Sequence, residues 1–308
     1  MGLPTSRQIR RSLSRLAART PREVRAVLRP VARRVGLAAA PGDWAHAAVP
    51  PWAAVPGASS DAVWCNICRW SGRSFLGEAH TESAACPRCG SIARDRFLFW
   101  CFLSRHPGPA GLRVLETSPR LGDDYRTFMR SWFDYRASDF DLSAHAGDIR
   151  IDLQAIDLPD ASLDVVLTPH VLEHVPDTAR ALGELHRVIA AGGRMYLQVP
   201  LVVGDTRVPS EPEFHADNTP VFFNFGWDLT DQLRAAGFDA DVLVTEQYFD
   251  WLTGRSPAPA SNGDGFVVES LVEHARPDDL IAVAGPAQSS RLGFVPAYHF
   301  ATWECRRM

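Results

Sequence analysis

The chain has 308 residues, of which 46% are hydrophobic and 22% are charged, so it is long enough for one large globular domain with a smaller companion. Its net charge is −4, yet the first 40 residues carry ten Arg against one acid, so the remainder is strongly acidic. That charge argues against general nucleic-acid binding, and no apolar run reaches the roughly 18 residues of a membrane span. The amino terminus also has no continuous apolar core to act as a secretory signal, and we expect a cytoplasmic protein.

The amino-terminal segment is the only strongly basic part of the chain. Residues 7–35 place apolar side chains on one face of two short helical patterns. One interpretation is a peripheral contact with an anionic membrane; the other is a tail, or a helix docked on the body. Residues 38–61 are rich in Ala, Pro and Gly, which is typical of a linker without regular structure. We therefore assign residues 1–62 to a basic segment and its linker.

Four of the six cysteines form two CxxC pairs. Each pair is a tight turn that can direct two thiolates at one point, and two such turns complete a tetrahedral site of four sulfurs. Thiolates suit zinc, and a short segment with few apolar residues needs a metal to fold. A redox dithiol and an iron–sulfur site are the alternatives. We predict one structural zinc ion, bound by Cys65, Cys68, Cys86 and Cys89.

A helix with a wide apolar face is expected next, over residues 91–103. Cys101 lies within it and is expected to be a core residue. This helix would connect the cysteine pairs to the rest of the chain. We therefore assign residues 63–105 to a zinc ribbon and its bridging helix.

From Leu112 onwards short apolar runs alternate with helical patterns, which is typical of a doubly wound α/β sheet. One helix is expected over 177–190, ended by Gly192 and Gly193, and another over 228–236. We assign residues 106–308 to this α/β domain, the third part of the chain. The expected strands are 112–115, 135–139, 147–152, 164–168, 194–200, 242–244 and 300–306.

The stretch from residue 164 to residue 193, DVV…HVLEHVPD…AL.EL.RV…GG, resembles the central motifs of class I methyltransferases that use S-adenosylmethionine. The segment CPRCGSIARDRFLFWCFL also resembles the join in bacterial methyltransferases with an amino-terminal four-cysteine ribbon, which are found among sugar and cell-surface polysaccharide genes. The resemblance covers residues 65–305. It implies a Rossmann-like sheet of the seven-stranded methyltransferase type, with S-adenosylmethionine as cofactor.

The resemblance also implies where the cofactor binds. The acid that ends the first strand and the turn after it would approach the cofactor, and Asp139 would accept hydrogen bonds from its ribose hydroxyls. Asp152 is similar to the family acid near the adenine, and Asp148 is the alternative candidate for that role. The turn keeps one glycine where the family has several. The implied cofactor-binding residues are Glu116, Ser118, Gly122, Asp139, Asp152 and His170.

The acceptor site is expected where the HVLEH turn meets the polar loop 204–218. Methyl transfer needs alignment of the two reactants and, for a hydroxyl acceptor, a base. His215, His174 and Glu173 are the candidate catalytic residues. Phe214 and Trp227 could give the acceptor an apolar wall.

A metal at the HVLEH turn is an alternative. His170, Glu173 and His174 have the spacing to hold a divalent ion on one helical turn. Ubiquinone-pathway and small-RNA 2′-O-methyltransferases use a similar E..EH set in this way. Here the first acid is a His, and the wider family has HVLEH without any metal.

The sequence therefore favours methyl transfer from S-adenosylmethionine to a hydroxyl or amine of a small molecule or saccharide. Two alternatives are an RNA methyltransferase that uses the ribbon as its reader and a non-enzymatic module that kept the fold. The altered glycine turn favours the latter, and the acidic body counts against the former. The sequence favours no particular oligomeric state.

Overall fold

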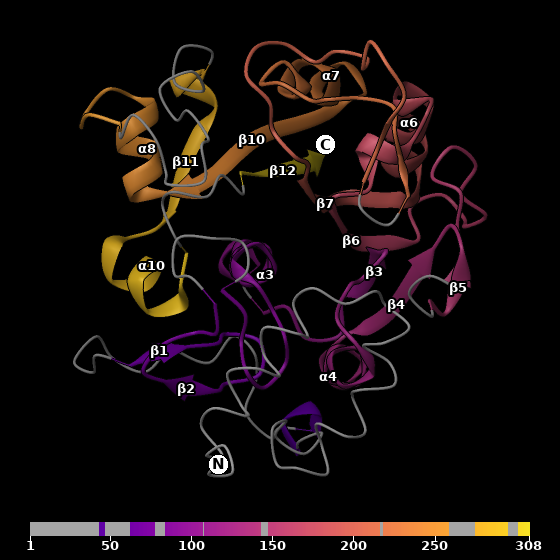
Figure 1. Ribbon diagram of the computed structural model, residues 1–308. Coiled ribbons are helices and arrows are strands. Elements are labelled where there is room, and N and C mark those ends of the chain that lie inside the picture. The colour runs from indigo at the N-terminus through magenta and orange to yellow at the C-terminus, as the bar shows by residue number, and fades with distance from the viewer. Residues whose placement is uncertain are drawn as a thin grey trace, which may run out of the picture. The chain divides into compact units, whose positions relative to one another are not determined.

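The computed structural model describes most of the chain beyond residue 61, and residues 44–308 form one compact unit (Figure 1). The prediction for residues 7–35 lies outside the described residues. Among the described helices none is long and apolar enough to cross a membrane. The described ranges are 43–46, 62–77, 84–106, 108–142, 147–215, 218–258, 275–294 and 301–308.

An eight-stranded sheet organises this unit, in the order β11-β10-β12-β7-β6-β3-β4-β5. All neighbours are parallel except β12, which runs antiparallel to both β7 and β10. The strands are β3 (Arg113–Thr117), β4 (Asp134–Asp139), β5 (Ile149–Arg150), β6 (Leu163–Pro169), β7 (Ile189–Gln198), β10 (Phe238–Thr245), β11 (Leu280–Ala284) and β12 (Thr302–Arg307).

The strand order confirms the predicted fold class. The seven expected strands lie in the order 3-2-1-4-5-7-6, with the last one inserted antiparallel, as in a Rossmann-like methyltransferase sheet. β11 adds an eighth strand at the edge, beside β10. The sequence analysis missed it, although Leu280–Ala284 is a continuous apolar run.

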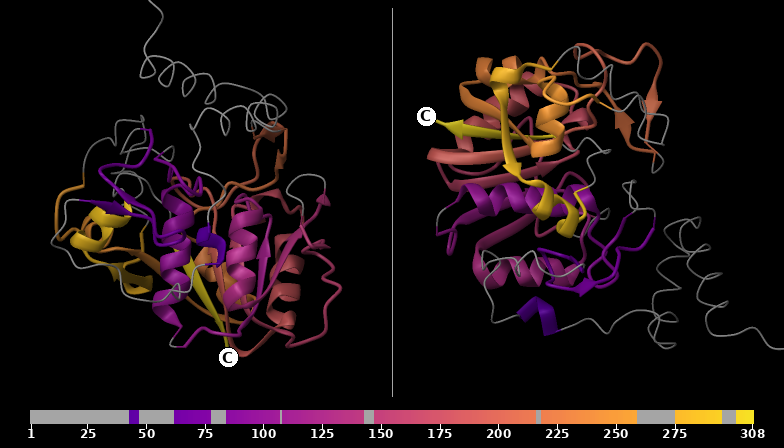
Figure 2. Two further views of the ribbon diagram at one scale, coloured as in Figure 1. Left: turned by 90° about the horizontal axis from the view of Figure 1, so that it is seen from below. Right: turned by 90° about the vertical axis from the view of Figure 1, so that its left-hand side faces the viewer.

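Helices cover both faces of the sheet, so that successive residues of a strand enter two different cores (Figures 1 and 2). In β6, Val166 packs with the core beneath α6, α7 and α8, whereas Val165 and Leu167 pack with the core beneath α3, α4 and α10. The helices are α3 (Ala93–Arg105), α4 (Asp123–Trp132), α6 (Thr178–Val188), α7 (Leu229–Ala235), α8 (Glu246–Leu252) and α10 (Pro286–Leu292).

The end of α6 differs from the prediction. The helix stops at Val188 and β7 begins at once, so Gly192 and Gly193 lie inside the strand and do not cap the helix. The pairing of β6 with β7 shifts register across this point. A Cβ on Gly193 would come within 2.8 Å of the Asp164 carbonyl oxygen, so the glycine permits a close backbone approach.

The cysteine-rich segment packs on the same core as α3 and α4. It contains the two short strands β1 (Val63–Trp64) and β2 (Ser71–Gly72), which pair antiparallel. Trp64 and Ile67 are buried in the core that includes Phe97 and Phe128. The predicted boundary at residue 105 stays a prediction, because this core continues across it.

Arg96 connects the cysteine-rich segment to the sheet domain, and Trp44 connects residues 43–46 to it. Arg96 of α3 is completely buried and donates hydrogen bonds to the carbonyl oxygens of Ser91 (2.6 Å), Ala84 (3.2 Å) and Leu292 (2.8 Å). Trp44 belongs to a single 3-10 turn, η1 (Asp43–His46), and its ring lies 5.7 Å from that of Phe128. At residues 43–46, therefore, the expected linker is structured, because it buries a large aromatic side chain.

Candidate functional site

The four predicted metal ligands lie together. Three are buried and Cys89 is half-buried, and all four sulfurs lie within 4.8 Å of one another. The Sγ–Sγ distance is 3.7 Å for Cys65 and Cys89, and 3.5 Å for Cys68 and Cys86. Sulfurs bound to one tetrahedral zinc at about 2.3 Å stand about 3.8 Å apart, so the spacing fits this metal.

The two turns that carry these cysteines are nearly identical in backbone geometry. Arg69 and Gly90 have positive φ angles of 58° and 75°, and each donates its N–H to the carbonyl of the first cysteine of its pair, at 2.9 Å. Ser91 Oγ lies 3.3 Å from Cys65 Sγ and 3.2 Å from Cys89 Sγ. Four thiolates leave no open coordination position, which makes this arrangement suited to a structural ion and not to catalysis.

The turn after β3 carries the first group of predicted cofactor residues. Ser118 occupies the left-handed region at φ 46°, a conformation usually left to glycine. Its N–H donates to the Ser138 carbonyl (2.7 Å) and its hydroxyl donates to Asp139 Oδ2 (3.1 Å). The turn therefore keeps its shape without a glycine, because both the backbone and the side chain of Ser118 are tied to the end of β4.

Gly122 and Asp152 complete this edge of the sheet. Gly122 is the N-cap of α4, and a Cβ there would meet no described atom within 4 Å. Asp152 follows β5, and its Oδ1 accepts from the N–H of Gln154 (2.9 Å). The alternative, Asp148, precedes β5, where Oδ2 accepts from the N–H of Ala137 (2.9 Å) and Oδ1 pairs with Arg130. Of the two, Asp152 is the one that follows its strand, at the edge where ligands bind in such sheets.

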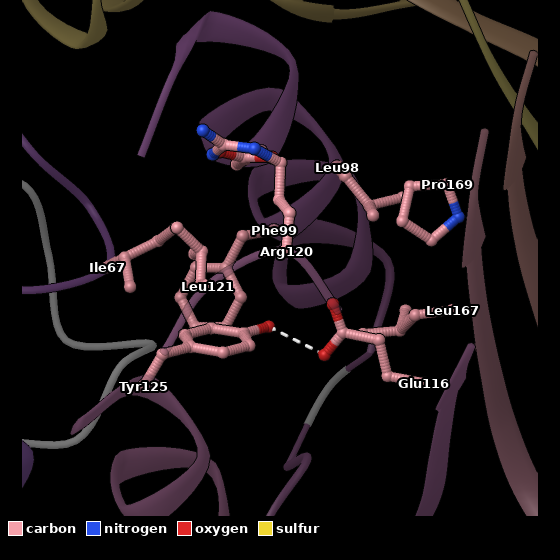
Figure 3. A pocket seen from close by; sticks show the side chains of 10 residues that line it. Ile67, Leu98, Phe99, Glu116, Arg120, Leu121, Tyr125, Leu167 and Pro169 are labelled. Carbon is pink, nitrogen blue, oxygen red and sulfur yellow. Dashed lines mark hydrogen bonds and ion pairs between the residues drawn. The ribbon is translucent and has the colours of Figure 1, made fainter. Parts of the chain in front are cut away.

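Glu116 is buried at the end of β3. Its Oε2 accepts hydrogen bonds from the hydroxyls of Tyr125 (3.0 Å) and Tyr135 (2.8 Å). Burial raises the pKa of Glu116 to about 7, although both tyrosine hydrogen bonds lower it. Figure 3 shows the Tyr125 hydroxyl directed at this carboxylate.

A small pocket opens beside Glu116 (Figure 3). It joins three parts of the chain: Ile67 of the ribbon, Leu98 and Phe99 of α3, and the turn after β3. Arg120 in that turn forms an ion pair with Asp95 of α3 and donates to the Gly90 carbonyl (3.3 Å). Sequence reasoning missed this contact, since no motif signals that the cysteine-rich segment and α3 meet the turn after β3.

The predicted catalytic residues also come together. The HVLEH turn contains a single 3-10 turn, η2 (Leu172–His174), and a hairpin of β8 (Glu213–Phe214) and β9 (Pro220–Val221) lies beside it. The Glu173 carbonyl accepts from the Phe222 N–H (2.8 Å). The rings of His174 and His215 are 4.7 Å apart and nearly perpendicular. Tertiary structure therefore unites residues that are 41 positions apart in the sequence.

Glu173 is almost completely buried, at 1% exposure, which is unexpected for a residue with an ionisable side chain. Among the described residues neither of its carboxylate oxygens has a hydrogen-bond partner. Oε1 lies 3.8 Å from His170 Nδ1 and 3.8 Å from His174 Nε2. Burial raises the pKa of Glu173 to about 8, and Arg94 partly offsets this.

His170 occupies a different environment. Its φ is 52°, and its N–H donates to the Gln198 carbonyl at 2.7 Å. Arg94 NH1 lies 3.4 Å from His170 Nδ1, which must therefore accept, because a guanidinium can only donate. Burial and Arg94 hold the pKa of His170 well below its usual range. This residue is neutral and held from α3, a contact that the sequence did not reveal.

The predicted apolar wall is only partly present. Phe214 is exposed on β8 and remains available to an acceptor. Trp227 is buried and packs against Trp303 of β12, with ring centroids 6.3 Å apart. The prediction for Trp227 was wrong, because the residue belongs to the core of the sheet.

Comparison with known proteins agrees with this geometry. Residues 129–197 match the family described as "Methyltransferase domain". A "Probable S-adenosylmethionine-dependent methyltransferase" of Mycolicibacterium smegmatis is 29% identical over 129 residues, 41% of this chain and 47% of that protein. An uncharacterized 37.1 kDa protein in transposon TN4556 of Streptomyces fradiae is 43% identical over 49 residues, 16% of this chain and 14% of that one. The chain spans less than half the length of these curated relatives.

Two solved structures are also similar. An S-adenosylmethionine-dependent methyltransferase from Mesorhizobium loti has a TM-score of 0.35 and 18% identity, over 44% of this chain and 79% of that one. A 1,6-didemethyltoxoflavin-N1-methyltransferase from Burkholderia thailandensis has a TM-score of 0.37 and 16% identity, over 65% of this chain and 72% of that one. The strand order of the eight-stranded sheet establishes the fold. Residues 129–197 therefore match a methyltransferase domain, in agreement with the resemblance given by the sequence.

Proposed function

We propose that this protein, which carries a methyltransferase domain, transfers the methyl group of S-adenosylmethionine to a hydroxyl or amine of a small molecule or saccharide. The observation that supports this best is the convergence of Glu173, His174 and His215 beside the carboxyl ends of the strands. Ligands bind at that edge in doubly wound sheets. The acceptor must lose a proton as its lone pair attacks the methyl carbon, and these side chains can take it.

The cofactor would bind along the ends of β3, β4 and β5. Ser118 and Asp139 form one hydrogen-bonded unit there, and Asp139 Oδ1 also accepts from the Asp141 N–H (3.1 Å). A carboxylate has enough lone pairs to accept from a ribose diol as well. Glu116, Gly122, Asp152 and His170 are the other residues that we propose to face the cofactor. The bound cofactor supplies an activated methyl group, and the chain supplies alignment.

His174 is well oriented to act as a base. Its Nδ1 lies 2.6 Å from the Pro220 carbonyl oxygen, which can only accept, so Nδ1 carries the proton. The lone pair is therefore on Nε2, the atom that faces Glu173. His215 is exposed on the hairpin and stands next to it. We propose that an acceptor bound between the two histidines gives its proton to one of them.

The four-cysteine site would hold zinc as a scaffold. Its donors are all thiolates and mostly buried, which fits this ion and excludes an acceptor from its coordination sphere. Because Arg120 connects the turn after β3 to Gly90 and Asp95, the folded ribbon would also hold the cofactor turn in place.

Calorimetry with S-adenosylhomocysteine tests the proposal, because product binding needs no knowledge of the acceptor. We expect saturable heat at one site per chain. No detectable heat at millimolar ligand would overturn the enzymatic proposal and favour a module that kept only the fold.

A further inference from the structure

The buried carboxylate of Glu173 is unusual for a folded protein. A buried ionisable group normally has a counter-ion or several hydrogen bonds, because its desolvation is costly. Both oxygens of Glu173 lack a hydrogen-bond partner among the described residues. Two imidazole nitrogens, of His170 and His174, each lie 3.8 Å from Oε1, which is too long for a hydrogen bond. A cation bound beside Glu173 would provide the partner that its two oxygens lack among the described residues.

His174 is oriented as a metal-binding histidine is. Its Nδ1–H donates to a backbone carbonyl, that of Pro220, and this fixes both the ring and the tautomer. The lone pair on Nε2 then faces the same space as Glu173 Oε1. Such a carbonyl contact is the usual partner of an imidazole that coordinates an ion through its other nitrogen.

His215 supplies a third donor from a different element. One ligand atom each from Glu173, His174 and His215 lie within 4.8 Å of one another. Neighbouring ligands around one ion stand about 3–3.5 Å apart, given bonds of about 2.1 Å. His215 is exposed, so rotation of its side chain can close the remaining gap. His170 is the less suitable third donor, because its Nδ1 already accepts from Arg94.

We propose that Glu173, His174 and His215 bind one divalent transition-metal ion, separate from the zinc of the four cysteines. Two imidazoles and one carboxylate suit the ions from Mn²⁺ to Zn²⁺. Three protein ligands leave coordination positions open. Glu173 would bind as the carboxylate, and the ion would provide the partner that its two oxygens lack.

The open positions suggest what the ion does, a step that rests on the proposed function. With His174 and His215 as ligands, the ion would take over the role of the histidine base: a hydroxyl oxygen bound to it would become more acidic and would release its proton to solvent as its lone pair attacks the methyl carbon. An acceptor with two adjacent oxygens, such as a sugar diol, could occupy two open positions and be aligned by both. The proposal therefore favours O-methylation of a vicinal diol over methylation of an amine.

Titration with Mn²⁺ tests the site directly. Manganese prefers oxygen and nitrogen ligands and is a poor match for four thiolates, so it reports on this site while zinc occupies the ribbon. The full chain, purified with its zinc, would be titrated with Mn²⁺ and the free ion followed by electron paramagnetic resonance. We expect one Mn²⁺ per chain, with the zinc content unchanged.

Two variants and one control make the test specific. Glu173→Gln keeps the shape of the buried side chain, and His215→Ala changes an exposed residue. Each should weaken Mn²⁺ binding by about tenfold or more. Glu246→Gln makes the same chemical change at an exposed position of α8, outside the site, and should leave the affinity unchanged.

The proposal is overturned if the wild-type chain binds no Mn²⁺ at millimolar concentration, or if both variants bind it as tightly as the control. The titration contains neither cofactor nor acceptor, so its failure leaves the proposed methyl transfer standing. Conversely, a chain that binds Mn²⁺ but not S-adenosylhomocysteine would reject the proposed function and keep the metal site.

Discussion

The four-cysteine site and the cluster of Glu173, His174 and His215 differ in how they are built. The cysteines lie on two tight turns of the same geometry, and their sulfurs are already at the spacing of a tetrahedral ion. The cluster combines one turn with a distant hairpin, and one of its three ligands, His215, is exposed. A closed, preformed site suits a structural ion, whereas an open, partly assembled one suits a site that must admit an acceptor.

The largest effect should follow from breaking the closed site. Cys68→Ser removes one thiolate, and structural zinc binding contributes on the order of 10 kcal/mol to folding of small zinc domains. Because Trp64 and Ile67 share a core with α3 and α4, the loss should reach beyond the ribbon. We expect no bound zinc and a thermal midpoint lowered by about 10 °C or more, measured by metal analysis and calorimetry.

Cys101→Ala is the matched control, since this thiol is buried outside the site. It should keep one zinc per chain and lose only about 1 kcal/mol of stability. Wild-type protein that was kept reduced and contains less than half an equivalent of zinc would contradict the structural role.

The open cluster should respond in the opposite way, with loss of turnover and little loss of stability. A general base or an acceptor-binding group contributes about 10²–10⁴-fold to rate. His215→Ala should therefore lower turnover at least 100-fold on the true acceptor, while affinity for S-adenosylhomocysteine and the thermal midpoint stay close to wild type.

Steady-state kinetics with Glu246→Gln as control checks this. A decrease of less than about threefold would assign His215 to structure, being far below the range of a base. If His174→Ala then produced the loss, the functional group would lie on the HVLEH turn and the hairpin would only shape the site.

Glu116 is a second buried carboxyl group and can be compared with Glu173. It accepts hydrogen bonds from described residues, whereas Glu173 accepts none. Tyr125 and Tyr135 donate to Glu116, Arg126 lowers its pKa and Asp95 raises it, and burial brings the folded value to about 7 from 4.5. The folded state therefore holds this proton more tightly than the unfolded state does. The free energy of unfolding should fall by about 3 kcal/mol as the pH rises from 4.5 to 7.

Denaturant titrations at several pH values measure this contribution. Glu116→Gln should lack that part of the fall, so that it gains stability relative to wild type as the pH rises. Glu246→Gln, at an exposed position on α8, should keep the fall. Parallel pH profiles of Glu116→Gln and wild type would show that the carboxyl does not hold its proton in the folded state.

The smallest effect concerns the ends of β3, β4 and β5, where we propose that the cofactor binds. Neither proposed metal site includes residues of this edge. Asp139→Ala should weaken S-adenosylhomocysteine by about 1–3 kcal/mol, the cost of leaving buried polar groups without a partner. Calorimetry with Asp141→Ala as the neighbouring control measures it. Equal affinities of the two variants would place the ribose elsewhere.

Local sequence determined the parts of this protein whose geometry depends on few residues. The two CxxC turns bring their own thiolates together, and apolar runs that alternate with helical patterns predict the strands of the doubly wound sheet. The N-cap at Asp177, which accepts from the Arg180 N–H (3.0 Å), is likewise a local feature. Such features involve residues close in the chain, so their pattern is visible before the chain folds.

Tertiary structure decided the rest, because those features depend on contacts between distant segments. Gly192 and Gly193 look like a helix cap in sequence, but packing of β7 against β6 places them in a strand. Trp227 looks like a site residue, yet β12 covers it. Only the hairpin beside the HVLEH turn brings His215 to Glu173, and only folding buries Glu173 without a hydrogen-bond partner among the described residues. Burial and long-range convergence carry no local sequence signal, which is why the candidate site needed the folded chain.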